Sequence, residues 1–185
     1  MCSSDLAMDG AYRALSELRS QGVVKAIGAG MNQWEMEARL AREGDFDCFL
    51  LAGRYTLLDH QALPEFLPLC QEKNISVIIG GPYNSGILAS DLTESATFNY
   101  VAAQPEVLDR ARRCKDVCDR HGVPLKAAAL QFVFGHPAVT AAIPGPRSAA
   151  EAEDNFQMMA HSIPAALWEE LRHEGLIPAE APTPA

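Results

Sequence analysis

Apolar and polar residues follow two patterns along this chain, and each pattern predicts one kind of element. In Ala7–Gln21 the apolar residues Ala11, Leu15 and Leu18 recur at helical spacing, and Gly22 provides a stop. The same spacing predicts further helices over Gln33–Glu43, Leu63–Lys73, Glu106–His121, Leu125–Phe134, Ser148–Met159 and Ala165–His173.

Short continuous apolar runs lie between these helices and predict buried strands over Val23–Ala29, Phe46–Ala52, Ile75–Gly81 and Ala138–Ile143. The regular alternation predicts an α/β fold, with a parallel sheet flanked by helices. The strand spacing fits either an open doubly wound sheet or half of a (β/α)8 barrel. No Gly-x-Gly-x-x-Gly motif opens the helix after a strand, which counts against the dinucleotide-binding doubly wound sheet.

Composition narrows the class of protein. The chain has 185 residues, of which 48% are hydrophobic and 21% charged, which suits one domain with a core. Its formal net charge of −9 argues against nucleic acid or an anionic membrane as a partner. No apolar run approaches the roughly 20 residues that a membrane span needs. The first residues lack the basic segment and apolar core of a secretory signal, so we expect a cytoplasmic protein.

The cysteines point in the same direction. They are odd in number and scattered, without a disulfide-like framework, which is typical of a reducing compartment: Cys2, Cys48, Cys70, Cys114 and Cys118. Cys114 and Cys118 stand four residues apart on a predicted helix, with His121 close behind. No further ligands are spaced like a zinc motif, so we expect packing or surface cysteines and no metal site.

One connection, Pro82–Pro105, is much longer than the others and contains Gly, Ser, Thr and Asn with the aromatic residues Phe98 and Tyr100. Loops of this length inside a compact domain are usually functional, so we expect it to help shape a substrate pocket. The last residues, 177–185, are rich in Pro and Ala, which predicts a flexible tail.

Several stretches of the chain carry a resemblance to a known family. They read "ALSELRSQGVVKAIGAGMN", "LLAGRYTLLDH", "VIIGGPYNSGILAS" and the run from "FNYVAAQPEVL" to "IPGPRSAAEAEDN". In this order and spacing they resemble the second half of an aldo-keto reductase, over essentially Ala7–Leu176. "RYTLLDH" and "FNYVAAQPEVL" look most like the sugar-oxidising branch. The resemblance implies that residues 7–176 form the C-terminal half of a (β/α)8 TIM-type barrel, strands five to eight with their helices.

The resemblance also implies that catalytic residues lie outside this chain. The family's Asp, Tyr, Lys and His come from the first four strands, so we assign no catalytic residue here, Tyr55 and His60 included. The opening "MCSSDL" joins abruptly onto a helix already in mid-pattern, and Cys-Ser-Ser-Asp-Leu matches one reading frame of a common sequencing-adapter end. We therefore expect residues 1–6 to be a non-native start on a truncated gene model; the alternative is a natural loop.

The loops "GGPYNSG" and "PGPRS" would follow barrel strands seven and eight, where phosphates favour binding. Gly80 and Gly81 allow close approach of a ligand to the backbone, and N–H groups near Ser85 and Arg147 could face a pyrophosphate. The alternative is that these glycines only make turns. The expected ligand is a nicotinamide dinucleotide.

At the nicotinamide end, Asn32 matches the family residue that hydrogen-bonds the carboxamide. Two positions depart from the family pattern. Ala52 replaces the Gln on the sixth strand, and Gly80 replaces the aromatic residue that stacks on nicotinamide at the end of the seventh. Tyr83 is close enough in sequence to supply a substitute face.

At the adenosine end, Asp154 and Asn155 match the family's acidic residue and Asn near the adenine. NADP-preferring members carry Lys and Arg at the positions where this chain has Gly145 and Glu151. A carboxylate repels a 2′-phosphate and can accept hydrogen bonds from a free ribose hydroxyl. The resemblance therefore predicts NAD, with NADP disfavoured.

Glu151 has a second possible role, because Ser148-Ala-Ala-Glu151 is also a capping box. In such a box Glu151 would accept the backbone N–H of Ser148, and this role is compatible with cofactor selection. Arg147 opposes the prediction of NAD, since its guanidinium could bind a 2′-phosphate as a charge-assisted donor.

The sequence thus predicts a fragment of an NAD-dependent oxidoreductase. The parent enzyme would move a hydride from C1 of a cyclic aldose or similar alcohol to NAD and give a lactone, with the missing Tyr as general base. A small sugar or alcohol is the expected partner, and the oligomeric state stays open. This chain alone is expected to be inactive. Two alternatives are a non-catalytic nucleotide-binding regulatory relative and an unrelated doubly wound domain.

Overall fold

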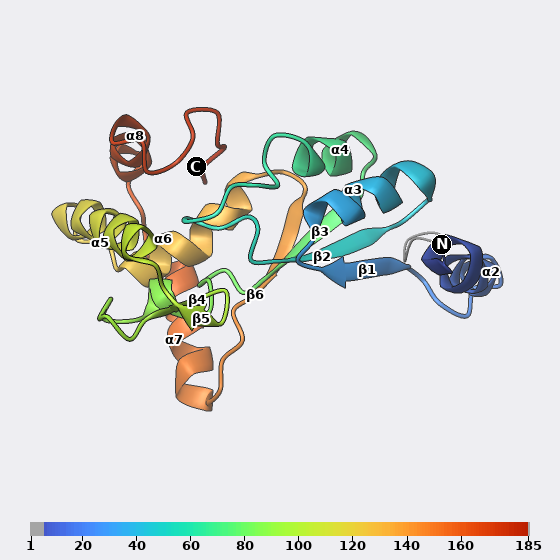
Figure 1. The fold of residues 1–185 in the computed structure, drawn as a ribbon, viewed down its shortest axis with the longest axis horizontal. Helices are drawn as coiled ribbons and strands as arrows, with labels where there is room; N and C mark the ends of the chain where they lie inside the picture. Colours follow the sequence, from blue (N-terminus) through green and yellow to red (C-terminus); the bar gives the residue numbers. More distant parts are fainter. Residues whose placement is uncertain (1–5, 185) are drawn as a thin grey trace.

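A parallel sheet of four strands is the centre of the fold, seen in a computed structural model that describes residues 6–184 (Figure 1). The strands lie in the order β1 (Gly28–Met31), β2 (Cys48–Ala52), β3 (Ser76–Gly80) and β6 (Val139–Ile143). Gly28 lies opposite Cys48, and Cys48 lies opposite Ser76. All three neighbouring pairs are parallel, so the predicted parallel α/β sheet is confirmed.

Helices form the crossover connections that parallel strands require. Helix α3 (Trp34–Glu43) joins β1 to β2, and α4 (Phe66–Glu72) joins β2 to β3. These two helices pack against each other on one side of the sheet (Figure 1). The connection from β3 to β6 is the longest and contains α5 (Pro105–Arg120) and α6 (Leu125–Phe132).

The other elements are short or lie near the ends of the chain. They are η1 (Ala7–Tyr12), α2 (Arg13–Ser20), η2 (Ile87–Ala89), η3 (Val133–Gly135), α7 (Ala149–Ala160) and α8 (Ala165–His173). Figure 1 shows α2 at one end of the sheet and α5, α6 and α8 gathered at the other. The predicted alternation of helices and strands is therefore the observed one.

Aromatic side chains pack against one another at the two ends of this core. Phe49 lies 5.8 Å from Phe66 between ring centroids, beneath α4, and both rings are fully buried. At the other end, Phe132 of α6 lies 5.3 Å from Tyr55 and 6.2 Å from Trp168 of α8. Each such buried ring contributes roughly 1.5–3 kcal/mol of transfer free energy, so the apolar faces of α4, α6 and α8 are fixed by packing.

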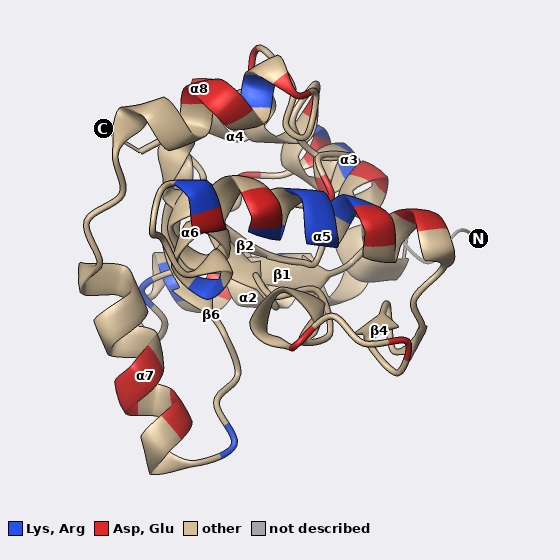
Figure 2. Cartoon of the chain, turned by 90° about the vertical axis from the view of Figure 1, so that its left-hand side faces the viewer, with Lys and Arg blue, Asp and Glu red and all other residues tan. Residues whose placement is uncertain are grey.

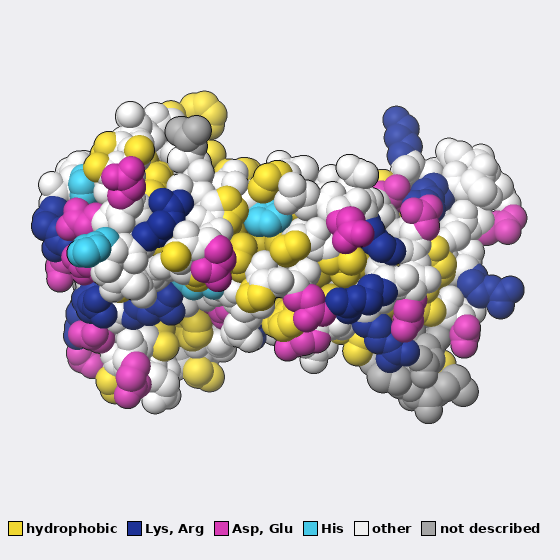
Figure 3. Space-filling view, turned by 90° about the horizontal axis from the view of Figure 1, so that it is seen from above, with side chains coloured by type: hydrophobic (Ala, Val, Ile, Leu, Met, Phe, Trp, Pro, Cys, Tyr) yellow, Lys and Arg dark blue, Asp and Glu magenta, His cyan; other side chains and the backbone are white. Residues whose placement is uncertain are grey.

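Charged side chains cover the outside of α5 and α8, as Figure 2 shows. Arg120 donates from Nε to Glu170 Oε1 at 2.7 Å, and His121 Nε2 lies 2.5 Å from Glu170 Oε2. These contacts lower the pKa of Glu170, first through His121 and then through Arg120. On the face seen in Figure 3, charged side chains gather at both ends and hydrophobic ones lie between them.

The first strand begins later than predicted. The sequence predicts a strand over Val23–Ala29, but β1 starts at Gly28. The reason lies at the end of α2, because the N–H groups of Val23 and Val24 both bond back to the carbonyl of Leu18. Gly22 permits this closing turn with a φ of 72°, and Val23 is left 66% exposed.

The strands are also less buried than their apolar runs predict. In β2 and β3 buried residues alternate with half-buried ones, whereas a strand covered on both faces would be buried at successive residues. The outer strands β1 and β6 have a partner on one side only, and in β6 both Thr140 and Ile143 are exposed. Among residues 6–184 no further strand pairs with either edge.

The long Pro82–Pro105 connection contains a hairpin that the sequence patterns did not predict. Strands β4 (Thr97–Phe98) and β5 (Val101–Ala102) pair antiparallel around the two-residue turn Asn99–Tyr100. Each strand has only two residues, which is too short for a period-2 pattern to be visible.

The end of the chain packs against the core as far as the structure describes it. Ile177 and Ala181, in the predicted flexible tail 177–185, are buried. Arg172 of α8 donates to the Ala181 carbonyl at 3.0 Å and to Thr183 Oγ1 at 2.8 Å. At the other end, the predicted non-native start, residues 1–6, lies outside the described residues except for Leu6.

Three cysteines are packing residues in the core. Cys70, Cys114 and Cys118 are buried, and burial raises the pKa of each thiol to about 12. Within the described ranges, no three His, Cys, Asp or Glu side chains gather as a metal site would require. Among these residues no helix combines the length and the apolar character of a membrane span.

Candidate functional site

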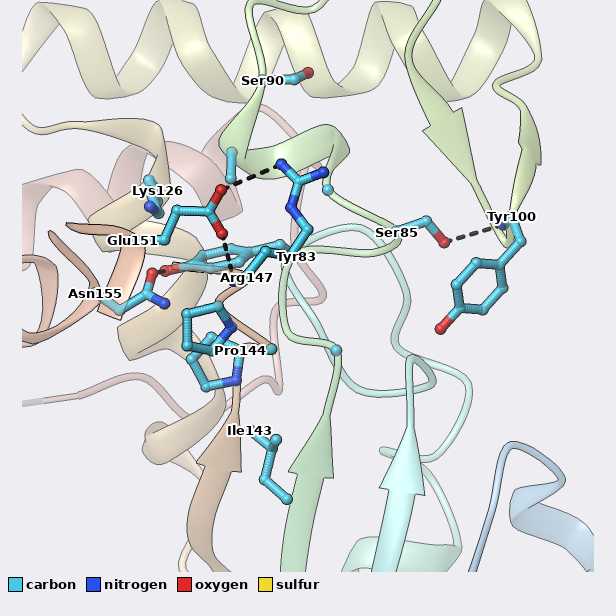
Figure 4. Close-up of a pocket in the computed structure, with 15 residues that line it drawn as sticks. Tyr83, Ser85, Ser90, Tyr100, Lys126, Ile143, Pro144, Arg147, Glu151 and Asn155 are labelled. Carbon is cyan, nitrogen blue, oxygen red and sulfur yellow. Dashed lines mark hydrogen bonds and ion pairs between the residues drawn. The ribbon is translucent and has the colours of Figure 1, made fainter. Parts of the chain in front are cut away.

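Two cavities that meet lie where the strands end. The first, of about 630 Å³, is enclosed by the turns after β3 and β6 and by helices α6 and α7 (Figure 4). The second, of about 260 Å³, lies over the ends of β1, β2 and β3. Gly81, Ser85 and Tyr100 line both. In parallel α/β sheets ligands bind at this carboxyl edge, so the joined cavities are the candidate site.

The residues predicted from the sequence gather here, with one exception. The first cavity is lined by Gly81, Tyr83, Ser85, Gly145, Arg147, Glu151 and Asn155. The second is lined by Asn32, Gly80, Gly81 and Ser85. Asp154 lines neither cavity; its carboxylate forms an ion pair with Lys126, which lines the first.

Left-handed backbone shapes the turn after β3. Gly81, Asn84, Ser85 and Gly86 have φ values of 62°, 46°, 58° and 94°. Gly81 also donates its N–H to the carbonyl of Ile143 at 3.0 Å, which joins this turn to the turn after β6. A side chain at Gly81 would meet no atom within 4 Å but would be strained by the positive φ. The glycine is therefore required by the turn and also leaves the cavity open.

Helix α7 begins at the first cavity, and its capping differs from the predicted box. Ser148 accepts the N–H of Glu151 on its Oγ at 3.2 Å, as predicted. The Glu151 carboxylate, however, accepts the backbone N–H of Arg147 at 2.7 Å and not that of Ser148. The Arg147 guanidinium donates to the other carboxylate oxygen at 3.2 Å. These two bonds, the backbone bond first, lower the pKa of Glu151, so it is ionised at neutral pH.

A polar cluster forms the wall of the first cavity at α6 and α7. The Tyr83 hydroxyl donates to Asn155 Oδ1 at 2.8 Å, and both residues are buried. Burial, followed by the charge of Asp154, raises the pKa of Tyr83, so this hydroxyl stays protonated. Lys126 lies with Nζ 5.4 Å above the Tyr83 ring while it pairs with Asp154. The structure thus places Tyr83 in the first cavity, whereas Asn32 and Gly80 line the second.

Lys126 was not predicted as a site residue. Its signal in the sequence is the one charge in the apolar run "VPLKAAALQF". The residue lies one position inside α6, and its Nζ reaches the cavity wall. Because a buried or half-buried lysine needs a partner, the Asp154 carboxylate holds it in place.

Arg54 connects the parts of the second cavity. It donates from Nε to the Asn32 carbonyl at 3.2 Å and from Nη1 to Asn99 Oδ1 at 3.1 Å. Asp59, which is buried, lies 3.3 Å from the same guanidinium. The turn after β1, the turn after β2 and the β4–β5 hairpin are therefore joined through one side chain.

A buried pair supports the floor of this cavity. Thr56 Oγ1 donates to Asn84 Oδ1 at 2.5 Å and accepts the N–H of Asp59 at 3.0 Å. Tyr55 and His60 flank this segment in sequence but line neither cavity. Burial, followed by the charge of Arg110, lowers the pKa of His60 to about 4, so its ring is neutral at neutral pH.

Comparison with known proteins decides the family. The model of the Aldo/keto reductase family matches residues 3–173. The chain belongs to this family. It is 44% identical over 172 residues to pyridoxal 4-dehydrogenase from Microbacterium luteolum, covering 93% of this chain and 50% of that protein. It is 39% identical over 175 residues to D-threo-aldose 1-dehydrogenase from a Pseudomonas species, covering 94% and 53%.

A solved structure agrees on the fold. The holo form of an aldo-keto reductase from Bacillus halodurans superposes with a TM-score of 0.72 at 20% identity, covering 94% of this chain and 57% of that chain. At this identity the likeness concerns the fold alone. The chain spans about half the length of the curated relatives that it matches.

In this aldo-keto reductase two small residues stand side by side at the strand ends. Ala52 and Gly80 lie opposite each other at the ends of β2 and β3, and both line the second cavity. A Cβ at Gly80 would meet Leu50 Cδ2 at 3.0 Å and Ala52 Cβ at 3.6 Å. A side chain at position 80 would therefore crowd Leu50, and at these strand ends neither residue carries a side chain larger than a methyl group.

Proposed function

We propose that this chain is the cofactor-binding half of an NAD-dependent oxidoreductase, and that the joined cavities bind the dinucleotide. The observation that carries the proposal is the continuity of the two cavities along the carboxyl edge of the sheet. The first cavity presents Lys126, Arg147, Glu151 and the start of a 12-residue helix, and the second presents Arg54 and the amide side chains of Asn32, Asn84 and Asn99. A dinucleotide whose pyrophosphate lies in the first cavity and whose carboxamide-bearing ring lies in the second would match these residues.

The residues of the first cavity suit a pyrophosphate and an adenosine. Gly81 and Gly145 have open space where a Cβ would lie, so a phosphate can approach the backbone of both turns. The free N–H groups at the start of α7 and its macrodipole favour an anion there. Asn155, oriented by the Tyr83 hydroxyl, keeps its amide NH₂ for an adenine nitrogen.

The residues of the second cavity suit a carboxamide ring. Asn32 is exposed at the end of β1 and can pair with a carboxamide through both its donor and its acceptor. Arg54 donates to the backbone carbonyl of Asn32 and so helps to hold the backbone from which that side chain projects. When bound, NAD supplies a nicotinamide ring that accepts a hydride.

The charge at Glu151 supports NAD over NADP. Its carboxylate is ionised and lies on the first cavity wall. A 2′-phosphate placed near it would be repelled, whereas a ribose hydroxyl can donate to it. Arg147 is the opposing charge, but it is engaged by Glu151 at both its backbone and its guanidinium.

The whole enzyme would be a (β/α)8 barrel in which β1, β2, β3 and β6 are strands five to eight. The open edges of β1 and β6 are where the missing strands would pair. The catalytic Asp, Tyr, Lys and His would lie on that missing half, and the reaction would oxidise an aldose or similar alcohol at C1 to a lactone. The names of the two relatives, both dehydrogenases and one of an aldose, support this substrate class. This chain alone would be inactive.

Ligand binding tests the cofactor. Saturation-transfer NMR with millimolar NAD or NADP detects weak binding to the 185-residue chain. We expect NAD to bind more tightly than NADP, and Glu151→Arg to reverse the order. Glu153→Gln, an exposed acidic residue on the same helix, is the control that should change neither. Preference of the wild type for NADP would contradict the proposal.

Sequencing the genomic region before the reading frame tests the missing half. We expect an in-frame extension that supplies the family's Asp, Tyr, Lys and His. An in-frame stop codon directly before Met1 would contradict the truncation. An extension that lacks the Tyr and Lys would instead support a nucleotide-binding protein without catalysis.

A further inference from the structure

Tyr100 is exposed at the tip of the β4–β5 hairpin, where the two cavities meet. The residue is 93% exposed, yet it lines both cavities. Figure 4 shows its ring pointing from the hairpin towards the ends of the strands. We propose that Tyr100 stacks on the flat ring of the ligand at the sheet end. Under the proposed function, on which this inference rests, that ring is the nicotinamide.

The hairpin is fixed in place by polar contacts. The Tyr100 N–H donates to Ser85 Oγ at 3.0 Å, and Thr97 Oγ1 donates to the Ser85 carbonyl at 3.0 Å. Arg54 donates to Asn99 Oδ1 and also to the carbonyl of Asn32. The same arginine therefore sets the position of the hairpin tip and of the proposed carboxamide partner.

The backbone at the tip is unfavourable for a tyrosine. Asn99 and Tyr100 have φ values of 52° and 64°, which make a two-residue turn of the I′ type between Phe98 and Val101. Such turns favour Asn followed by Gly, because glycine takes a positive φ without strain. A tyrosine in the second position keeps that strain, and its exposed ring gains no packing in return. Strained residues of this kind cluster at ligand sites.

The second cavity has a place for a ring but no other aromatic face. Among the described residues that line it, Tyr100 is the one aromatic side chain. Gly80 and Ala52 place no side chain larger than a methyl group on its floor, and the Tyr83 ring is buried in the wall of the other cavity. A planar group seated on this floor would have the edge of the sheet on one side and Tyr100 available for the other. Offset stacking is the geometry that two such rings prefer.

The test compares NAD with ADP-ribose, which lacks the nicotinamide ring. Saturation-transfer NMR on the 185-residue chain reports the adenine and nicotinamide protons separately. We expect both rings to be saturated in the wild type. Tyr100→Ala should weaken the nicotinamide signal relative to the adenine signal and raise the Kd for NAD about 2–10-fold. The Kd for ADP-ribose should stay unchanged.

Two variants serve as controls. Tyr100→Phe keeps the ring and should bind NAD like the wild type. Val101→Ala truncates an exposed side chain of the same hairpin that lines neither cavity, and it should alter nothing. Circular dichroism of each variant checks that the fold is retained.

The outcomes separate the inference from the proposed function. Equal weakening of NAD and ADP-ribose by Tyr100→Ala would show that the residue acts through the hairpin and would overturn the inference. An unchanged nicotinamide signal, or a wild type in which only the adenine is saturated, would overturn it as well, while leaving the cofactor site intact. A wild type that binds neither ligand would overturn the proposed function itself.

Discussion

At two places along the carboxyl edge of the sheet a glutamate carboxyl group accepts a backbone N–H, once in the core and once at the surface. At the end of β1, Glu37 Oε1 accepts the N–H of Met31, the last residue of the strand, at 3.2 Å. After β6, Glu151 Oε2 accepts the N–H of Arg147 at 2.7 Å. Glu37 is fully buried, and its Oε2 has no hydrogen-bond partner among the described residues. Glu151 has a side chain that is 39% exposed and a guanidinium beside it.

The difference in burial and in neighbouring charge sets the ionisation state of each glutamate. Burial raises the pKa of Glu37 to about 8, and its bond to Met31 only partly offsets this effect. Contacts with Arg147 lower the pKa of Glu151. At neutral pH the backbone next to Asn32 is therefore held by a largely neutral carboxyl group, and the turn after β6 by a carboxylate. A similar hydrogen bond thus stabilises the two places in different pH ranges.

The largest expected effect is that of Glu37→Gln at alkaline pH. Since the pKa of Glu37 is higher in the folded chain than its ordinary value of 4.5, folding loses stability as the pH rises from 4.5 through about 8. Gln carries no charge and avoids this loss, so the variant should be more stable than the wild type by about 4 kcal/mol at pH 8. At pH 4 the two should be nearly equal.

Urea unfolding at several pH values between 4 and 8 measures this difference. Glu35→Gln, an exposed residue of the same helix, is the matched control and should follow the wild type. The groups facing Glu37 include the Cys70 thiol on α4, whose pKa of about 12 keeps it neutral over this range. Parallel pH profiles for the wild type and Glu37→Gln would contradict the raised pKa.

The next effect comes from the helix caps beside these two places. Ser148 caps α7 with its side chain, whereas Gln33, at the start of α3, makes no side-chain cap bond. Ser148→Ala should therefore cost about 1 kcal/mol, and Gln33→Ala should cost almost nothing. Thermal unfolding of the two variants checks this. Equal losses would mean that the Ser148 bond to Glu151 contributes nothing to stability.

The sequence predicts the fold at both places but not their electrostatics. Helical spacing and apolar runs give the alternation of elements, because burial of one face is what these patterns record. The start of β1 was misplaced since Val23 and Val24 are strand formers by type, yet their N–H groups close the end of α2. These hydrogen bonds depend on the positive φ of Gly22, and a propensity scale contains no information on that backbone conformation.

At the candidate site, the sequence points to residues that a local turn requires, and it misses side chains whose partners come from distant segments. Gly81 could be found because it takes a positive φ in the turn after β3, a conformation that glycine adopts without strain. Lys126 and Arg54 could not, because their partners Asp154 and Asn99 are brought to them by packing. The acceptor role of Glu151 was anticipated, but its donor is one residue earlier than a capping box implies.

The smallest effect expected is that of Glu151→Gln. The pKa of Glu151 lies below its ordinary 4.5 in the folded chain, so its carboxylate stabilises the fold above that pH. This stabilisation is lost as the pH falls through the lowered pKa. The variant should therefore unfold at slightly lower urea concentration than the wild type at pH 7, and at the same concentration once Glu151 is protonated in the wild type. Because the pair is exposed, added salt should reduce the difference.

Urea midpoints at pH 7 and pH 3, each at low and high salt, measure this effect, with Glu153→Gln as the control on the same helix. The direction matters more than the size. With rising pH, Glu37→Gln should gain stability over the wild type, whereas Glu151→Gln should lose it. If both variants moved in the same direction, the charge of Arg147 would not distinguish the two glutamates, and the support that Glu151 gives to NAD over NADP would fall with it.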